Sequence, residues 1–304
     1  MSSRNLIIGA YHRGLRRIIL GLTVAVYTYM LPDAVLVFEA LQQNFSKDLV
    51  GKIPLLIIFM LAAAYIVWGI KIQKTLQVLM VAGVSSIIVA IIISVEQNPN
   101  KHIHIPEYVL MTWILFEAIS IDYRGKGMGL LILMCASMLG IVDELLQGIH
   151  PARSYGWIDM LINFASSVIG VLTLITIRRL PGGDWSWVQN LKAFTKSWII
   201  FLVGAAAAVW MCVILFGVAA AEFPPKQIPV LLIAGGLVFI LAAIITSANH
   251  GYGLYQLDCI HQSENNDFNS SLRTAHLWIV YPVTILVAIN ALYIWITITN
   301  SAFR

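Results

Sequence analysis

The chain has 304 residues, of which 59% are hydrophobic and only 11% are charged. A water-soluble domain carries about 25% charged residues, so this composition, with a mean hydropathy of +0.83, excludes an ordinary soluble protein. The net charge of +4 is small and is spread among short polar segments, which argues against a basic nucleic-acid-binding surface.

Apolar runs long enough to cross a bilayer recur along the whole chain. A membrane-spanning helix needs about 20 apolar residues, and we predict an all-α, polytopic transmembrane helical bundle of about nine spans, with eight as the alternative. The predicted spans cover residues 18–40, 53–70, 76–95, 105–121, 128–146, 158–177, 198–221, 228–248 and 277–298. The first contains Pro32 and Asp33, so we expect it to break at the proline and to continue as a surface helix.

The distribution of Lys and Arg predicts the orientation of these spans. With nine spans and a cytoplasmic N-terminus, 13 of the 19 basic residues fall on the cytoplasmic side. Because cytoplasmic loops are enriched in basic residues, we predict that the N-terminus is cytoplasmic. The protein is expected to be a multi-pass protein of the cell (cytoplasmic or inner) membrane.

The chain divides into three segments along its length. Residues 1–97 hold about three spans, residues 98–177 hold a three-span core with polar motifs, and residues 178–304 hold three further spans. The segment 178–197 is amphipathic and is expected to lie on the cytoplasmic membrane surface. The loop 249–276 contains three histidines, but their spacing matches no familiar metal-ligand set.

Three short polar stretches in the central segment all fall on the outer side in this topology. The first runs from Asn100 to Tyr108, the second is Asp143-Glu144-Leu145-Leu146-Gln147, and the third begins at Pro151. Residues three or four apart share one face of a helix. His104 therefore shares a face with Tyr108, as Asp143 does with Gln147 and Asp159 does with Asn163.

Ionisable groups at membrane depth are costly unless they face protein or a water-filled pocket. We therefore expect a single outer-facing pocket with Lys101 at its rim. Its predicted members are His104, Tyr108, Asp143, Glu144, Gln147, Arg153, Asp159 and Asn163.

The same residues carry a family resemblance. Lys101, His104 and Tyr108 form the pattern Lys-x-x-His-x-x-x-Tyr, which is followed by Asp-Glu-x-x-Gln, by Pro-x-Arg, and by Asp and Asn. In this order and spacing the motifs resemble the VanZ-like family of small membrane proteins, named for a teicoplanin-resistance protein, over about residues 98–172. Asn100 and Ser166 stand where the family usually has Asp and Gly. The resemblance implies a membrane location linked to the cell envelope and a polar site, more than a particular reaction.

Three function hypotheses follow from these patterns. In the first, the site binds an anionic lipid headgroup or a lipid-linked envelope precursor. Lys101 and Arg153 then hold phosphate, and His104 with Asp143 or Glu144 supplies proton transfer for hydrolysis or transfer at phosphate. A divalent cation on Asp143, Asp159 and Asn163 is an open alternative. Tyr108, Gln147, Asp159 and Asn163 are the remaining predicted ligand-binding residues.

In the second hypothesis the protein is a non-enzymatic accessory or assembly subunit of a membrane complex, and the ion network fixes its fold. The third, a transporter, is disfavoured because the ionisable residues gather at one face instead of at the midplane. The expected partners are membrane lipids and other membrane subunits, and no nucleic acid.

Overall fold

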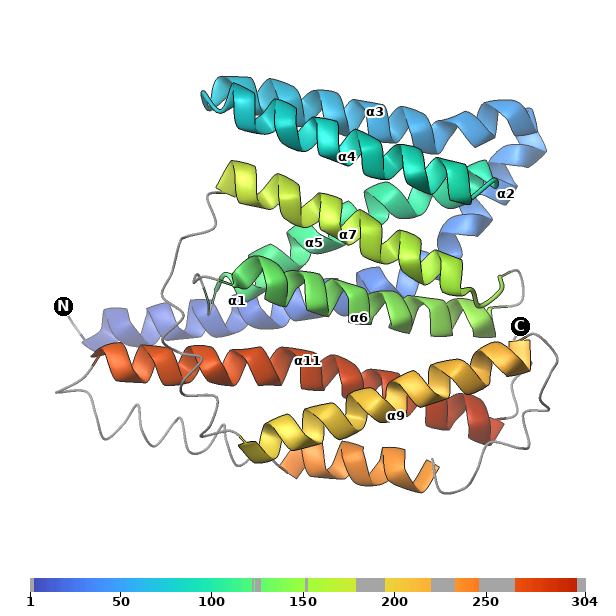
Figure 1. Cartoon of the computed structure of the whole chain (residues 1–304). Coiled ribbons are helices and arrows are strands. Elements are labelled where there is room, and N and C mark those ends of the chain that lie inside the picture. Colours follow the sequence, from blue (N-terminus) through green and yellow to red (C-terminus); the bar gives the residue numbers. More distant parts are fainter. Residues whose placement is uncertain are drawn as a thin grey trace. The chain divides into compact units, whose positions relative to one another are not determined.

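The computed structural model describes residues 3–121, 123, 127–150, 153–178, 195–219, 233–245 and 266–299. All regular structure in these residues is helical (Figure 1). Seven of their helices are long and apolar enough to cross a membrane: Gly14–Asp33, Lys47–Lys71, Thr75–Val95, Met128–Ile149, Trp157–Arg178, Trp198–Gly217 and Leu277–Thr299. The prediction of an all-α, multi-pass membrane fold is confirmed, whereas the number of nine spans and the orientation stay predictions.

Two of the nine predicted spans are not among these seven. The predicted span 105–121 corresponds to α5 (His104–Ile119), which has 16 residues. At a rise of 1.5 Å per residue it is about 24 Å long, shorter than the roughly 30 Å hydrocarbon layer. The predicted span 228–248 is described only over the shorter apolar helix Ile233–Ile245.

Packing divides the chain into two compact units. Unit 1 comprises Met1–Asp143 and Ile158–Gly182, and unit 2 comprises Glu144–Trp157 and Gly183–Arg304. Helix α6 (Met128–Ile149) contributes its residues up to Asp143 to unit 1 and its last turns to unit 2. The three predicted segments therefore remain a division along the sequence.

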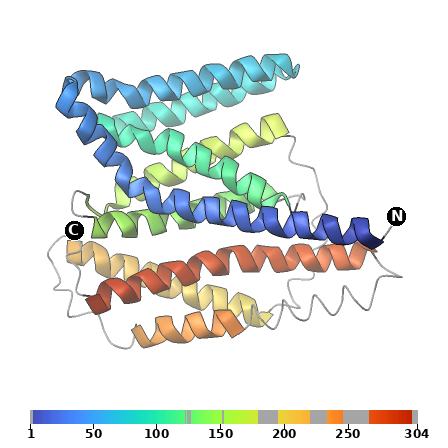
Figure 2. The same cartoon turned by 180° about the vertical axis from the view of Figure 1, so that it is seen from behind.

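Unit 1 begins with a helix that changes direction at a proline. Helix α1 (Ser3–Met30) is followed by the 3-10 turn η1 (Leu31–Asp33) and then by α2 (Ala34–Asn44). Figure 2 shows that α2 leaves the line of α1. Pro32 lacks the N–H that would continue the hydrogen-bond ladder, so the predicted break at this residue is confirmed.

Helices α3 (Lys47–Lys71) and α4 (Thr75–Val95) form a tight hairpin. The Ser46 side chain caps α3 by accepting a hydrogen bond of 3.3 Å from the backbone N–H of Leu49. At the other end Gly69 lies so close to Val78 that a Cβ at position 69 would overlap the valine side chain. This glycine therefore permits the close approach of the two helices.

The core of unit 1 joins α4, α5 and α7 (Trp157–Arg178). Ile92, Ile105, Ile162 and Ile169 are buried together in one apolar cluster. A Cβ at Gly170 of α7 would overlap Thr112 and would lie 3.2 Å from Cα of Val109, both on α5. Small residues that allow such approach are typical of packing between membrane helices.

The far end of α7 carries a second group of charges. Glu117 at the end of α5 accepts hydrogen bonds of 3.0 Å from both Arg16 and Arg178. Asp159 and Arg178 are 19 residues apart on α7, which separates them by about 28 Å along the helix axis. Because this length matches the hydrocarbon thickness of about 30 Å, the two polar ends of unit 1 suit opposite membrane faces.

Unit 2 is built on α9 (Thr195–Ala219) and α11 (Asn266–Thr299). The hydroxyl of Tyr293 lies 2.7 Å from Sγ of Cys212 and donates to the carbonyl of Ala208 at 3.2 Å. Most of the predicted surface segment 178–197 and of the loop 249–276 lies outside the described residues.

Candidate functional site

The turn that follows α4 positions the first polar side chains of the site in unit 1. The backbone N–H of Asn98 donates to Oε1 of Glu96 at 2.7 Å, and the Asn98 side chain accepts from the N–H of Asn100 at 3.1 Å. Pro99 then starts the 3-10 turn η2 (Pro99–Ile103), which runs directly into α5. These local bonds fix the position of Lys101, because an asparagine cap and a proline both restrict the backbone.

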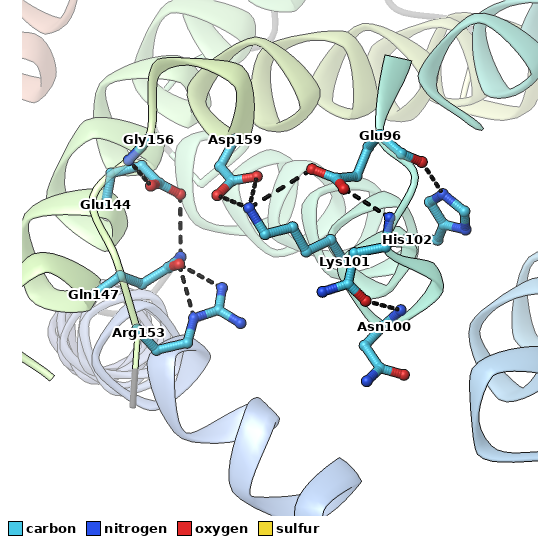
Figure 3. A network of polar contacts seen from close by, with 10 residues as sticks. Glu96, Asn100, Lys101, His102, Glu144, Gln147, Arg153, Gly156 and Asp159 are labelled. Atoms are coloured by element: carbon cyan, nitrogen blue, oxygen red, sulfur yellow. Dashed lines mark hydrogen bonds and ion pairs between the residues drawn. The ribbon is translucent and has the colours of Figure 1, made fainter. Parts of the chain in front are cut away.

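Lys101 is held between two carboxylates (Figure 3). Its ammonium lies 3.0 Å from Oδ1 and 2.7 Å from Oδ2 of Asp159. Oε2 of Glu96 lies 3.6 Å away on the other side. Asp159 is buried, whereas the Lys101 side chain keeps 27% of its surface exposed, so the pair lies at the rim of the unit.

Two histidines flank this turn with different environments. His102 is buried and its Nε2 lies 3.0 Å from the carbonyl oxygen of Glu96, which can only accept a hydrogen bond. His104 begins α5, is also buried, and its Nδ1 lies 3.1 Å from Oε2 of Glu107. His104 therefore has a carboxylate partner one helical turn away on its own helix.

A tyrosine links the face of α5 that carries His104 to helix α6. The rings of His104 and Tyr108 have their centroids 6.5 Å apart. The Tyr108 hydroxyl donates to Oδ2 of Asp143 at 3.0 Å, and both side chains are fully buried. His104 and Tyr108 thus share one face of α5, as helical spacing predicts, and Tyr108 connects that face to Asp143 of α6.

Asn163 on α7 lies close to the same tyrosine. A Cβ added to Gly140 of α6 would lie 3.3 Å from Cβ of Asn163 and 3.6 Å from the Tyr108 hydroxyl. Asn163 is fully buried, and its backbone carbonyl accepts from the Ser167 hydroxyl at 2.8 Å. The absence of a side chain at Gly140 therefore leaves space beside both Asn163 and Tyr108.

The remaining three predicted site residues form a group within unit 2 (Figure 3). The Gln147 amide donates to Oε1 of Glu144 at 3.1 Å. Arg153 donates to Oε1 of Gln147 from Nε at 3.0 Å and also from Nη2. Oε2 of Glu144 accepts from the backbone N–H of Gly156 at 3.3 Å. Glu144 and Gln147 are fully buried and Arg153 is half-buried.

The loop that carries Arg153 is anchored by Tyr155. Its ring is buried and lies 4.6 Å from that of Phe216 on α9, measured between centroids. Burial raises the pKa of the Tyr155 hydroxyl well above its ordinary value, and the neighbouring Cys212 thiol raises it further. The phenol is therefore neutral at physiological pH.

The structure thus places the nine predicted residues in two groups, one in each unit. Their predicted convergence in a single pocket stays a prediction. The group in unit 1 contains Lys101, His104, Tyr108, Asp143, Asp159 and Asn163, and the group in unit 2 contains Glu144, Gln147 and Arg153.

Helical spacing already placed Glu107 on the same face as His104, and the two side chains are in contact. Sequence reasoning did not include Glu96, which faces Lys101, or Tyr27, whose hydroxyl donates to the backbone carbonyl of Glu107 at 3.0 Å. The sequence signal for Glu96 is its closeness to the motif. Tyr27 lies 80 residues from Glu107 in sequence, and only the packing of α1 on α5 brings them together.

Each carboxylate in or beside the unit 1 group has its own partner: Asp159 and Glu96 lie beside the Lys101 ammonium, Glu107 lies beside His104, and Asp143 accepts from the Tyr108 hydroxyl. The ammonium of Lys101 is already paired, so it is less suited to hold a phosphate. Among the described residues no set of three His, Cys, Asp or Glu side chains is arranged to hold a metal ion. The proposed divalent cation therefore gains no support from this part of the chain.

No protein-family model, curated protein or solved structure matches this chain. The resemblance to the VanZ-like family therefore rests on the motif residues alone.

Proposed function

We propose that this protein is a VanZ-like multi-pass protein of the cytoplasmic membrane that binds a phosphate-bearing lipid headgroup, or a lipid-linked envelope precursor, through Arg153. The observation that carries the proposal is the buried chain from Glu144 through Gln147 to Arg153. A guanidinium is a rigid fork of five N–H donors, and a fixed partner on one side orients it for a phosphate on another.

The hydrogen bonds from Glu144 through Gln147 hold the guanidinium of Arg153 in position. The amide oxygen of Gln147 accepts from the guanidinium, and its amide nitrogen donates to Glu144. Glu144 in turn accepts a hydrogen bond from the backbone N–H of Gly156. Arginine is favoured for phosphate recognition because two parallel N–H bonds can contact two phosphate oxygens. Lys101 is less suited to this role, since it is already paired with Asp159 and Glu96.

Proton transfer is the second part of the proposal and rests on His104. Imidazole changes its protonation nearer to neutral pH than any other side chain. Nδ1 of His104 lies 3.1 Å from Oε2 of Glu107, which can accept a hydrogen bond from it. His104, with Asp143 linked through Tyr108, is therefore the residue we assign to hydrolysis or transfer at phosphate, and this assignment is separate from binding by Arg153.

Lipid binding is tested by native mass spectrometry of the detergent-purified protein with a polyprenyl phosphate. Arg153→Ala is expected to lower the bound fraction about tenfold, the loss for a charge-assisted hydrogen bond of about 1.4 kcal/mol. Gln147→Leu should lower it as well, because it removes the partner that orients the guanidinium. Lys52→Ala is the control, since it removes one exposed positive charge that we predict to lie on the same membrane face. Unchanged binding by folded Arg153→Ala would refute the proposal.

A second function is favoured by a specific observation. Lys101 is satisfied by two carboxylates, as is typical of an ion pair that holds helices together. In this reading the protein is a non-enzymatic accessory or assembly subunit. It predicts that substitutions in both groups lower thermal stability while lipid binding by the folded fraction stays unchanged.

A further inference from the structure

An open groove of about 830 Å³ lies at the end of unit 1 remote from Lys101. Its walls are the α3–α4 turn with the first turns of α4, and the last turns of α7, represented by Ile175 and Thr176. Helix α3 ends at Lys71, α4 begins at Thr75 and α7 ends at Arg178. The groove therefore lies where three membrane-spanning helices end, at the depth of lipid headgroups.

The mouth of the groove is polar and basic. Gln73, Lys74 and Gln77 line it, and the Lys74 ammonium donates to the backbone carbonyl of Thr176. This bond holds the positive charge of Lys74 between α4 and α7.

The described residues at this end of the unit carry an excess of positive charge. Its described basic residues are Arg16, Arg17, Lys71, Lys74 and Arg178, against the single carboxylate of Glu117, which is shared by two of the arginines. Such an excess of positive charge attracts anionic lipid headgroups.

The apolar residues that line the groove are exposed. Leu76, Met80 and Ile175 are 71%, 58% and 49% exposed. Helix α4 packs into the apolar cluster of unit 1 through Ile88, Val89 and Ile92 near its other end. Side chains at the beginning of α4 therefore remain available to an acyl chain.

From these observations we infer that the groove binds one phospholipid with an anionic headgroup. The phosphate lies at the mouth beside Lys74 and the glutamine amides, and the beginning of an acyl chain lies along Leu76, Met80 and Ile175. The volume is within the range of about 300–1,000 Å³ that is usual for ligand sites. The binding site is distinct from Arg153 and does not depend on the function proposed above.

The inference is tested on the full chain in detergent by native mass spectrometry with phosphatidylglycerol and with phosphatidylcholine. Wild-type protein is expected to retain phosphatidylglycerol in preference to phosphatidylcholine. Lys74→Glu should lower the retained phosphatidylglycerol at least about fivefold, because a basic residue near a membrane surface contributes about 1 kcal/mol to binding anionic lipid. Lys52→Glu, which reverses an exposed charge at the beginning of α3, is the matched control and should not change retention.

A second variant keeps Lys74 and blocks the groove instead. Gln77 is an exposed groove residue, and Gln77→Trp should exclude the lipid and lower retention to a similar extent. Ile87→Trp places the same bulk on an exposed position of α4 outside the groove and should have no effect.

Three results would overturn the inference: wild-type retention by both Lys74→Glu and Gln77→Trp, equal retention of the two lipids, or equal losses in the control variants. Arg153→Ala should retain phosphatidylglycerol normally, so failure of the proposed function and failure of this inference are distinguishable.

Discussion

The ammonium of Lys101 lies 2.7 Å and 3.0 Å from the two carboxylate oxygens of Asp159. The pair connects the turn before α5 to the first turn of α7, and its two residues are 58 positions apart in the sequence. Because Asp159 is 1% exposed, removal of Lys101 would leave a buried carboxylate without its cation. Lys101 therefore has a structural task in addition to any contact with a ligand.

Replacing Lys101 by Met should destabilise the protein by about 1–3 kcal/mol, because it leaves the buried Asp159 carboxylate without its cation. The double substitution Lys101→Met with Asp159→Leu should recover part of that loss, since a buried ion pair can often be replaced by apolar side chains at little cost. Thermal unfolding of the purified variants in detergent measures both effects. A double variant that is less stable than Lys101→Met alone would contradict the assigned pairing.

Arg153 and Arg178 are predicted to face opposite sides of the membrane. Single cysteines at positions 153 and 178, in a background with Cys135, Cys212 and Cys259 replaced, should react with an impermeant thiol reagent from opposite sides. The reason is the length of α7, about 28 Å from Asp159 to Arg178, which matches the hydrocarbon layer. Labelling of both positions from the same side would disprove this topology.

Gly170→Leu should lower thermal stability much more than Gly235→Leu. A side chain at position 170 would overlap Thr112 of α5, whereas a Cβ at position 235 meets no atom within 4 Å. Overpacking of this kind typically costs about 1–3 kcal/mol. Melting temperatures of the two purified variants make the comparison, and equal shifts would show that α5 and α7 do not pack closely at Gly170.

Tyr155 should contribute to loss of stability in alkali. Its pKa is raised in the folded protein, first by burial and then by Cys212, so the folded state keeps the phenol proton after the unfolded state has lost it. The stabilising contribution is complete below the ordinary tyrosine pKa of about 10 and is lost as pH rises above that value.

Tyr155→Phe should therefore flatten the decline of thermal stability above about pH 10, relative to wild-type protein. A pH–stability profile parallel to that of the wild type would contradict the assignment.

Part of the site was predictable from helical spacing. His104 and Tyr108 are four residues apart and share one face of α5, as the sequence indicates, whereas the contact of Tyr108 with Asp143 is known only from the structure. The pairing of Lys101 with Asp159 was not predictable, because it depends on which ends of α5 and α7 lie side by side. Periodicity identifies the face of one helix, and it contains no information on the helix opposite.

By itself the sequence determined the membrane class and the helical fold and indicated Pro32 as a place where the first span could break, because hydropathy and the missing proline N–H act locally. The tertiary structure decided the partner of each charged group. Lys101 pairs with two carboxylates, and Arg153 donates to the amide oxygen of Gln147. Glu117 pairs with arginines on α1 and α7. Burial makes an unpartnered charge costly, but which partner satisfies it depends on distances between helices that are far apart in the chain.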